Sequence, residues 1–232
     1  MSASATEVVF LPGFDGNAQL RGEFVSAFAH RRPARAIGYP NRALGSLDGY
    51  RDYVASQVSP DSRPIVIAES FSGLVAARWA ATDSRVAGLA LCGAFARNPA
   101  PLVARLGSWA PSIARFAGSR MGDPRGTGWE RDLPASIRAL RLEVIAERLR
   151  LIANEDISAE LSSLRAPVTL VQFEDDEVIG PRARRHLESV CHNARIVRLP
   201  GPHFNIEVNP IPCAGAIAPW LAPLFEKPVQ AE

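Results

Sequence analysis

The stretch IVIAESFSGL at residues 65–74 joins a short, apolar, β-branched run to a helical pattern through a serine with small neighbours. A strand, a sharp turn carrying a serine and then a helix is the order typical of a nucleophile elbow. Ala68 and Ser72 stand two residues either side of Ser70, where strand and helix cross closely. The helix N-terminus directs backbone N–H groups toward developing negative charge. The simpler alternative is that Ser70 only caps a helix over 71–82.

The composition restricts the class of protein. The 232 residues are 47% hydrophobic and 22% charged with a net charge of +2, which is ordinary for one globular domain. Without a basic stripe, we expect no nucleic-acid partner. No apolar run approaches the roughly 20 residues that span a bilayer, and the N-terminus lacks a signal-peptide pattern. The cysteines are odd in number and widely spaced: Cys92, Cys191 and Cys213. This pattern predicts free thiols and a cytoplasmic protein.

Apolar runs alternate with helical patterns in the first part of the chain. Buried strands are predicted over 7–11, 34–39, 64–69 and 86–92, and amphipathic helices over 17–30, 47–58 and 71–82. This alternation predicts a parallel sheet with helices on both faces. The strands are continuous apolar runs, as expected when both faces of a sheet are covered.

The alternation stops between residues 95 and 165, where no strand is predicted. Helical patterns cover 102–116, 134–154 and a short piece from Ile157 to Leu164, and a Gly- and Arg-rich loop is predicted over 118–132. Strands resume over 167–173 and 194–199, with a helix over 182–190 and a proline-containing helix over 213–225. We therefore predict an α/β core at 1–94 and 166–232, with a helical cap at 95–165 inserted before the last two strands.

A serine hydroxyl needs a base to become a good nucleophile, and the base needs an orienting group. On a parallel sheet such groups gather after the carboxyl ends of the strands. His203 follows the last predicted strand, whereas the other three histidines lie in or near surface helices. The acidic run 174–177 follows the strand before it and contains Asp175 and Asp176. Either aspartate has the position of the orienting acid, and the alternative for most of the run is a solvated turn.

Ser70, an aspartate and then His203 is the nucleophile–acid–histidine order of the α/β-hydrolase fold, and the chain resembles a small bacterial α/β hydrolase from residue 7 to 225. The resemblance is carried by LPGFDG at 11–16, AESFSG at 68–73, FEDD at 173–176 and GPHF at 201–204. The family's spacing favours Asp176 over Asp175. Ala68 and Ser72 replace the usual elbow glycines. Because only six residues precede the first strand, we expect about six strands, all parallel.

The resemblance also implies the other parts of the site. The oxyanion hole would consist of the backbone N–H groups of Phe14 and Phe71. The cap would shape an acyl pocket, and five side chains are candidates for its lining: Phe95, Trp109, Phe116, Met121 and Trp129. The alternative for each of the five is that it only packs the cap against the core.

The implied activity is hydrolysis of a small, uncharged carboxylic ester by a Ser-His-Asp triad through an acyl-enzyme. No HExxH motif or grouped Cys and His ligands are present, so we expect neither metal nor cofactor. Thioester hydrolysis, acyl transfer and carbon–carbon bond cleavage run on the same triad, and a non-catalytic ligand receptor can retain it. A haloalkane dehalogenase would need aspartate at position 70.

Overall fold

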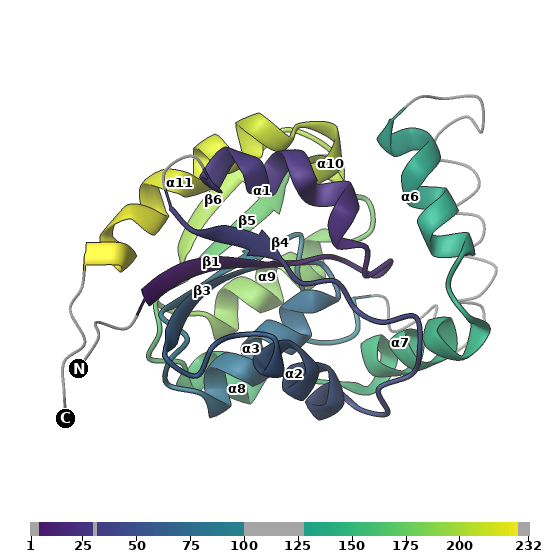
Figure 1. The fold of residues 1–232 in the computed structure, drawn as a ribbon, viewed down its shortest axis with the longest axis horizontal. Helices are drawn as coiled ribbons and strands as arrows, with labels where there is room; N and C mark the ends of the chain where they lie inside the picture. Colours follow the sequence, from purple (N-terminus) through teal and green to yellow (C-terminus); the bar gives the residue numbers. More distant parts are fainter. Residues whose placement is uncertain (1–4, 30–31, 100–127, 227–232) are drawn as a thin grey trace.

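The centre of the molecule is one six-stranded sheet. The structure, a computed structural model, describes residues 5–29, 32–99 and 128–226. All strand pairs are parallel, in the order β2-β1-β3-β4-β5-β6 (Figure 1). The strands are β1 (Ala5–Leu11), β2 (Ala34–Ala36), β3 (Ser62–Glu69), β4 (Gly88–Cys92), β5 (Val168–Phe173) and β6 (Arg195–Leu199). The predicted parallel sheet of about six strands is confirmed.

Helices cover both faces of this sheet (Figure 1). One face carries η1 (Ala18–Arg21), α1 (Gly22–Ala29), α10 (Asn205–Val208) and α11 (Pro210–Glu226). The other face carries α2 (Leu47–Ser56), α3 (Ser72–Thr82), α8 (Ser158–Ser163) and α9 (Pro181–Val190). The short helix α10 was not predicted, and α11 begins at Pro210, three residues earlier than predicted.

The two faces have separate hydrophobic cores because successive strand side chains point to opposite sides. In β1, Val9 and Leu11 pack with Tyr50 of α2 in one core. Val8 and Phe10 pack with α1 and α11 in the other. The sheet is buried on both sides, which is why its strands are continuous apolar runs.

Two further helices, α6 (Trp129–Arg138) and α7 (Leu142–Asn154), lie beyond the carboxyl ends of the strands (Figure 1). The prediction of one helix over 134–154 is wrong, and residues 129–132 are helical rather than a loop. Asn41 explains the break, because its side chain donates to Ala139 O at 2.9 Å and accepts from Arg141 N at 2.8 Å. A contact from 100 positions away leaves no local pattern in the sequence.

The described residues between β4 and β5 contribute no strand to the sheet. Their one extended pairing is an isolated bridge between Arg97 and Asp156. The predicted helix over 102–116 lies outside the described residues. The division into core and cap domains stays a prediction. In the described part of the chain, no helix is long and apolar enough to cross a membrane.

Candidate active site

Ser70 occupies the sharp turn between β3 and α3. Its φ of 50° is the one positive φ of a non-glycine residue in the described chain, and such strain is concentrated at functional turns. The N-cap of α3 is Phe71 and has no side-chain cap hydrogen bond. The alternative in which Ser70 serves as a helix cap therefore does not describe this turn.

The small residues of the elbow allow close packing and add a bond that the sequence did not suggest. A Cβ on Gly73 would lie 2.7 Å from the Ala94 Cβ, so only glycine fits there without a shift. Ser72 Oγ donates to Pro12 O at 2.5 Å and also contacts the Tyr39 hydroxyl. Ser72 therefore ties the elbow to the loop after β1 in addition to being small.

The structure brings Ser70, His203 and Asp176 together in one hydrogen-bonded chain. His203 Nδ1 lies 2.8 Å from Asp176 Oδ2, and His203 Nε2 lies 2.9 Å from Ser70 Oγ. Because a carboxylate only accepts, Nδ1–H is the donor, and the Ser70 hydroxyl then donates to the free Nε2. Asp176 and His203 are 5% and 4% exposed, so little water competes for these bonds.

The two neighbouring aspartates have different contacts. Asp176 is buried, and its second oxygen accepts from Val178 N at 2.9 Å and Ile179 N at 2.8 Å. Asp175 is exposed, and its carboxylate accepts from Gly201 N at 3.0 Å. Asp175 therefore braces the backbone of the loop that carries the histidine, while Asp176 contacts the imidazole.

Two glycines near the triad make room for neighbouring side chains, Gly93 for His203 and Gly201 for Asn205. A Cβ on Gly93, whose φ is 53°, would lie 3.2 Å from His203 Nδ1. Gly201 has a φ of 125°, and its Cβ would lie 2.2 Å from the Asn205 side chain. Gly201 belongs to the GPHF motif at 201–204, whereas no sequence pattern pointed to Gly93 after β4.

The backbone N–H groups of Phe14 and Phe71 have no hydrogen-bond partner among the described residues. Phe71 follows Ser70 directly, and Phe14 lies in the loop after β1, which lines a cavity together with Ser70. Unpaired donors beside a serine hydroxyl suit a developing oxyanion.

Ser70 and His203 line a cavity of about 100 Å³. Phe95 lies in its wall, and other described side chains there are mostly apolar: Leu133, Ile137, Ile152, Val178, Ile179 and Phe204. Trp129, at the start of α6, is not among the described lining residues. The other three pocket candidates, Trp109, Phe116 and Met121, lie outside the described residues.

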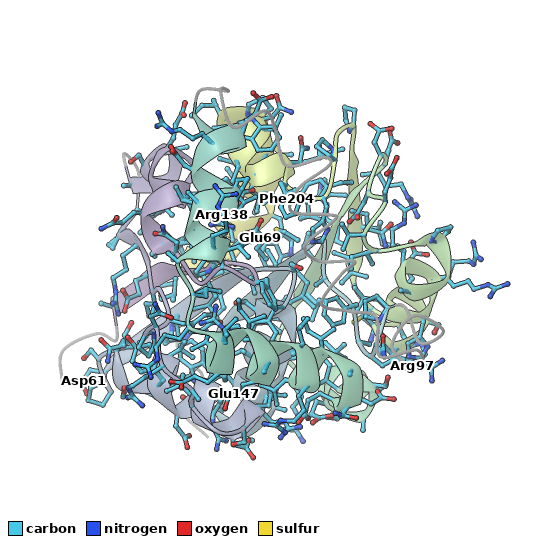
Figure 2. All side chains as sticks on the ribbon, turned by 90° about the vertical axis from the view of Figure 1, so that its right-hand side faces the viewer. Asp61, Glu69, Arg97, Arg138, Glu147 and Phe204 are labelled. Atoms are coloured by element: carbon cyan, nitrogen blue, oxygen red, sulfur yellow. The ribbon has the colours of Figure 1, made fainter. Side chains whose placement is uncertain are left out.

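A cluster of buried charges borders the same cavity and was not anticipated from the sequence. Arg21 pairs with Asp15 at 2.7 Å, with Glu69 at 2.9 Å and with Glu207. Arg21, Asp15 and Glu69 line the cavity, and Glu69 lies near Phe204 in Figure 2. Burial, reinforced by the neighbouring carboxylates and opposed by Arg21, raises the pKa of Glu207 well above its usual value.

The described residues offer no other ready nucleophile or metal site. All three cysteines are free, as predicted, and they are also buried. Burial raises the pKa of Cys191 to about 11 and that of Cys213 to about 12, which disfavours the reactive thiolate. No group of three or more His, Cys, Asp or Glu residues in the described chain is arranged to hold a metal ion.

The fold and this arrangement define a class of protein, and comparison with known families agrees. The model of the alpha/beta hydrolase family matches residues 8–214. The chain therefore belongs to the alpha/beta hydrolase family. No curated protein sequence matches it.

Solved structures with the same fold come from several bacteria. A hydrolase from Pseudomonas aeruginosa is 18% identical with a TM-score of 0.76, over 95% of this chain and 91% of that one. An esterase from a Rhodococcus species is 21% identical with a TM-score of 0.72, and the match covers 95% of this chain and 91% of that one. The enol-lactonase from Burkholderia xenovorans is 17% identical with a TM-score of 0.73, and the match covers 96% of this chain and 92% of that one. At these identities the likeness concerns the fold.

Proposed function

We propose that this protein is a serine hydrolase that cleaves a small, uncharged carboxylic ester through an acyl-enzyme. The observation that carries the proposal is the continuous chain of hydrogen bonds from Ser70 through His203 to Asp176. Such a chain turns a weak hydroxyl nucleophile into a reactive one. The esterase and lactonase titles among the structural neighbours agree with this chemistry.

In the acylation step, Ser70 Oγ attacks the ester carbonyl carbon while His203 Nε2 takes the hydroxyl proton. The carbonyl oxygen becomes an oxyanion and accepts from the N–H groups of Phe14 and Phe71. Asp176 stays ionised, holds the imidazole ring in one tautomer and stabilises the imidazolium that forms.

The tetrahedral intermediate then collapses and the bond to the leaving alcohol breaks. His203 Nε2–H gives its proton to the alcohol oxygen, which leaves an acyl group on Ser70. In the second half-reaction His203 takes a proton from a water molecule, whose oxygen bonds to the acyl carbon. The bond between the acyl carbon and Ser70 Oγ then breaks, His203 Nε2–H returns the proton to Ser70 Oγ, and the carboxylic acid leaves.

The cavity supports a small and mainly apolar acyl group. About 100 Å³ is below the roughly 300–1,000 Å³ of common ligand pockets. Phe95, in the segment after β4, and Ile137 of α6 offer apolar walls. Arg21, Asp15 and Glu69 in the lining already pair with one another, so a charged acyl chain would lose hydration there without a free partner.

The test is hydrolysis of p-nitrophenyl esters from acetate to laurate by the wild type and by Ser70→Ala. We expect turnover of the short esters by the wild type and a loss of at least about 10³-fold in kcat for Ser70→Ala. Ser163→Ala is a matched control, because it removes an exposed serine hydroxyl that donates to Glu160 O and has no bond to His203.

Equal turnover by the wild type and Ser70→Ala would contradict the proposal. Turnover of p-nitrophenyl thioesters at least tenfold faster than of the matching oxygen esters would replace the ester by a thioester. Tight binding of an ester with no turnover would favour the receptor alternative.

A further inference from the structure

Several polar backbone groups of the loop after β1 are hydrogen-bonded next to the proposed oxyanion hole. Pro12 O accepts from Ser72 Oγ, and Gly13 N–H donates to Glu69 Oε2 at 3.0 Å. Gly13 O accepts from Gly16 N at 3.1 Å. The N–H groups of Phe14 and Asp15 have no partner among the described residues, and of these two the Phe14 N–H is the proposed oxyanion donor.

The Phe14 carbonyl is held by a charged side chain from α7. Arg148 is 0% exposed, and its Nη1 donates to Phe14 O at 2.5 Å while its Nε donates to the Tyr50 hydroxyl at 3.1 Å. Its guanidinium lies over the rings of Tyr39 and Tyr50, at 5.2 and 5.6 Å from their centroids. The charge is thus surrounded by aromatic rings and one backbone carbonyl.

The burial of Arg148 has a cost in free energy. Its Nη2 has no hydrogen-bond partner among the described residues, and no ion pair to a described carboxylate satisfies the charge. A buried cation without such a partner loses hydration and lowers stability. Packing alone would be served better by an apolar side chain, so its contact with the loop calls for a functional explanation.

The loop and α7 are both shaped to keep this contact. Gly16 has a φ of 71°, and a Cβ there would lie 2.8 Å from Arg148 Nη1, so the loop leaves room for the guanidinium. The neighbouring Glu147 (Figure 2) anchors α7 by accepting from Leu44 N at 2.8 Å and Gly45 N at 2.6 Å. Arg148 therefore projects from a helix that is fixed in place.

We propose that Arg148 is a positioning residue of the oxyanion hole: its bond to the Phe14 carbonyl fixes the loop so that the Phe14 N–H faces the developing oxyanion. This inference rests on the proposed serine hydrolase. Through Arg148, helix α7 sets the geometry of the oxyanion hole, although the two N–H groups of that hole lie in the segments that follow β1 and β3. A substrate contact that shifted α7 would therefore change the rate of the chemical step rather than only the affinity.

The experiment compares Arg148→Met, Arg148→Lys and the control Arg150→Met. Arg150 is exposed on the same helix and also donates to a backbone carbonyl, that of Gly45, at 2.8 Å. Steady-state kcat and KM are measured with p-nitrophenyl butyrate. The inhibition constant is measured with an alkyl trifluoromethyl ketone, whose carbonyl carbon bonds to Ser70 Oγ while His203 takes the proton and the carbonyl oxygen becomes an oxyanion.

We expect Arg148→Met to lower kcat by about 10- to 100-fold, since an ångström of misplacement has effects of that size. KM should change less than threefold, and the trifluoromethyl ketone should bind more weakly by the same factor as kcat falls. Arg148→Lys should recover part of both losses because it keeps a cationic donor. Arg150→Met should leave kcat and the inhibition constant within twofold of the wild type.

A folded Arg148→Met with wild-type kcat and ketone affinity would overturn the inference. A rise in KM alone would also overturn it, because that pattern indicates uniform binding rather than transition-state geometry. If Arg148→Met does not fold, kcat, KM and the ketone inhibition constant of Arg148→Lys are compared with those of the wild type. Wild-type kcat and ketone affinity in Arg148→Lys would then overturn the inference.

Backbone amide NMR separates this inference from the proposed function. Changed shifts of the Gly13 to Gly16 amides in Arg148→Met or Arg148→Lys, and unchanged ones in Arg150→Met, support the positioning contact even if the wild type hydrolyses no ester. Unchanged loop amides in the Arg148 variants would refute it whatever the activity.

Discussion

The triad and the oxyanion loop lie side by side at the ends of parallel strands, but different forces hold them. The triad residues lie in the turns that follow their strands, and their main bonds run to one another or to nearby backbone, as with Asp176 to Val178 and Ile179. The loop after β1 is held by Glu69, 56 positions from Gly13, and by Arg148, 134 positions from Phe14.

Because of this difference, we expect the triad and the oxyanion loop to respond to different substitutions. The triad members bond to one another across 133 and 27 positions, but each is placed by the turn after its own strand, so changes at its own members should dominate. The oxyanion loop depends on buried charges brought from η1, β3 and α7, so distant charge changes should affect it. Three predictions test this contrast.

The largest effect is expected at the acid turn. Asp176→Asn should lower kcat by about 10³- to 10⁴-fold, because the imidazole loses its orienting carboxylate and adopts the wrong tautomer. Asp175→Asn should stay within a few fold of the wild type, since an amide oxygen can still accept from Gly201 N. Steady-state kinetics on both variants checks this, and a larger loss at Asp175 would contradict the triad described above.

An intermediate effect is expected at Gly93. An alanine there would place its Cβ 3.2 Å from His203 Nδ1 in a left-handed conformation, so we expect a fall in kcat of about 10- to 100-fold. The strain should also lower the free energy of unfolding by about 1–2 kcal/mol. Urea denaturation and steady-state kinetics measure the two quantities.

Gly45→Ala is the matched control for Gly93→Ala. Gly45 also has a positive φ, 85°, but a Cβ there would meet no atom within 4 Å. It should lose similar stability and keep its kcat. If Gly45→Ala lost as much activity as Gly93→Ala, backbone strain rather than crowding of His203 would be the cause.

The smallest effect is expected at the charge cluster under the loop. The pKa of Glu207 is raised in the folded protein, so above the ordinary glutamate pKa of about 4.3 the folded state holds a proton that the unfolded state has lost. Stability from this group is therefore present at low pH and falls as pH rises. Glu207→Gln does not titrate and should be more stable than the wild type by about 1 kcal/mol at pH 8.

Urea midpoints of the wild type and Glu207→Gln at pH 5 and pH 8 test this sign. The difference between the urea midpoints of Glu207→Gln and the wild type should widen as the pH rises. The kcat of Glu207→Gln should differ from that of the wild type by less than twofold. Glu143→Gln, at an exposed glutamate of α7, should show no such widening. A gap that narrowed with pH would mean that Glu207 is ionised and stabilising beside Arg21.

The sequence by itself determined the order of the strands along the chain, the parallel sheet and the positions of Ser70 and His203 after their strands. These features are local: apolar runs, helical spacing and turn residues report the backbone near them. The sequence narrowed the acid to two neighbours, because both follow the same strand. The free cysteines were also predicted correctly.

Only the tertiary structure decided which aspartate faces the imidazole, where the helical segment between β4 and β5 breaks, and what holds the oxyanion loop. Asn41 divides the predicted helix at 139–141 from about 100 positions away. Arg21 gathers three carboxyls from separate segments, and Arg148 reaches Phe14 from α7. Such contacts pair residues that are far apart along the chain, and their energies depend on burial, which a local sequence pattern does not contain.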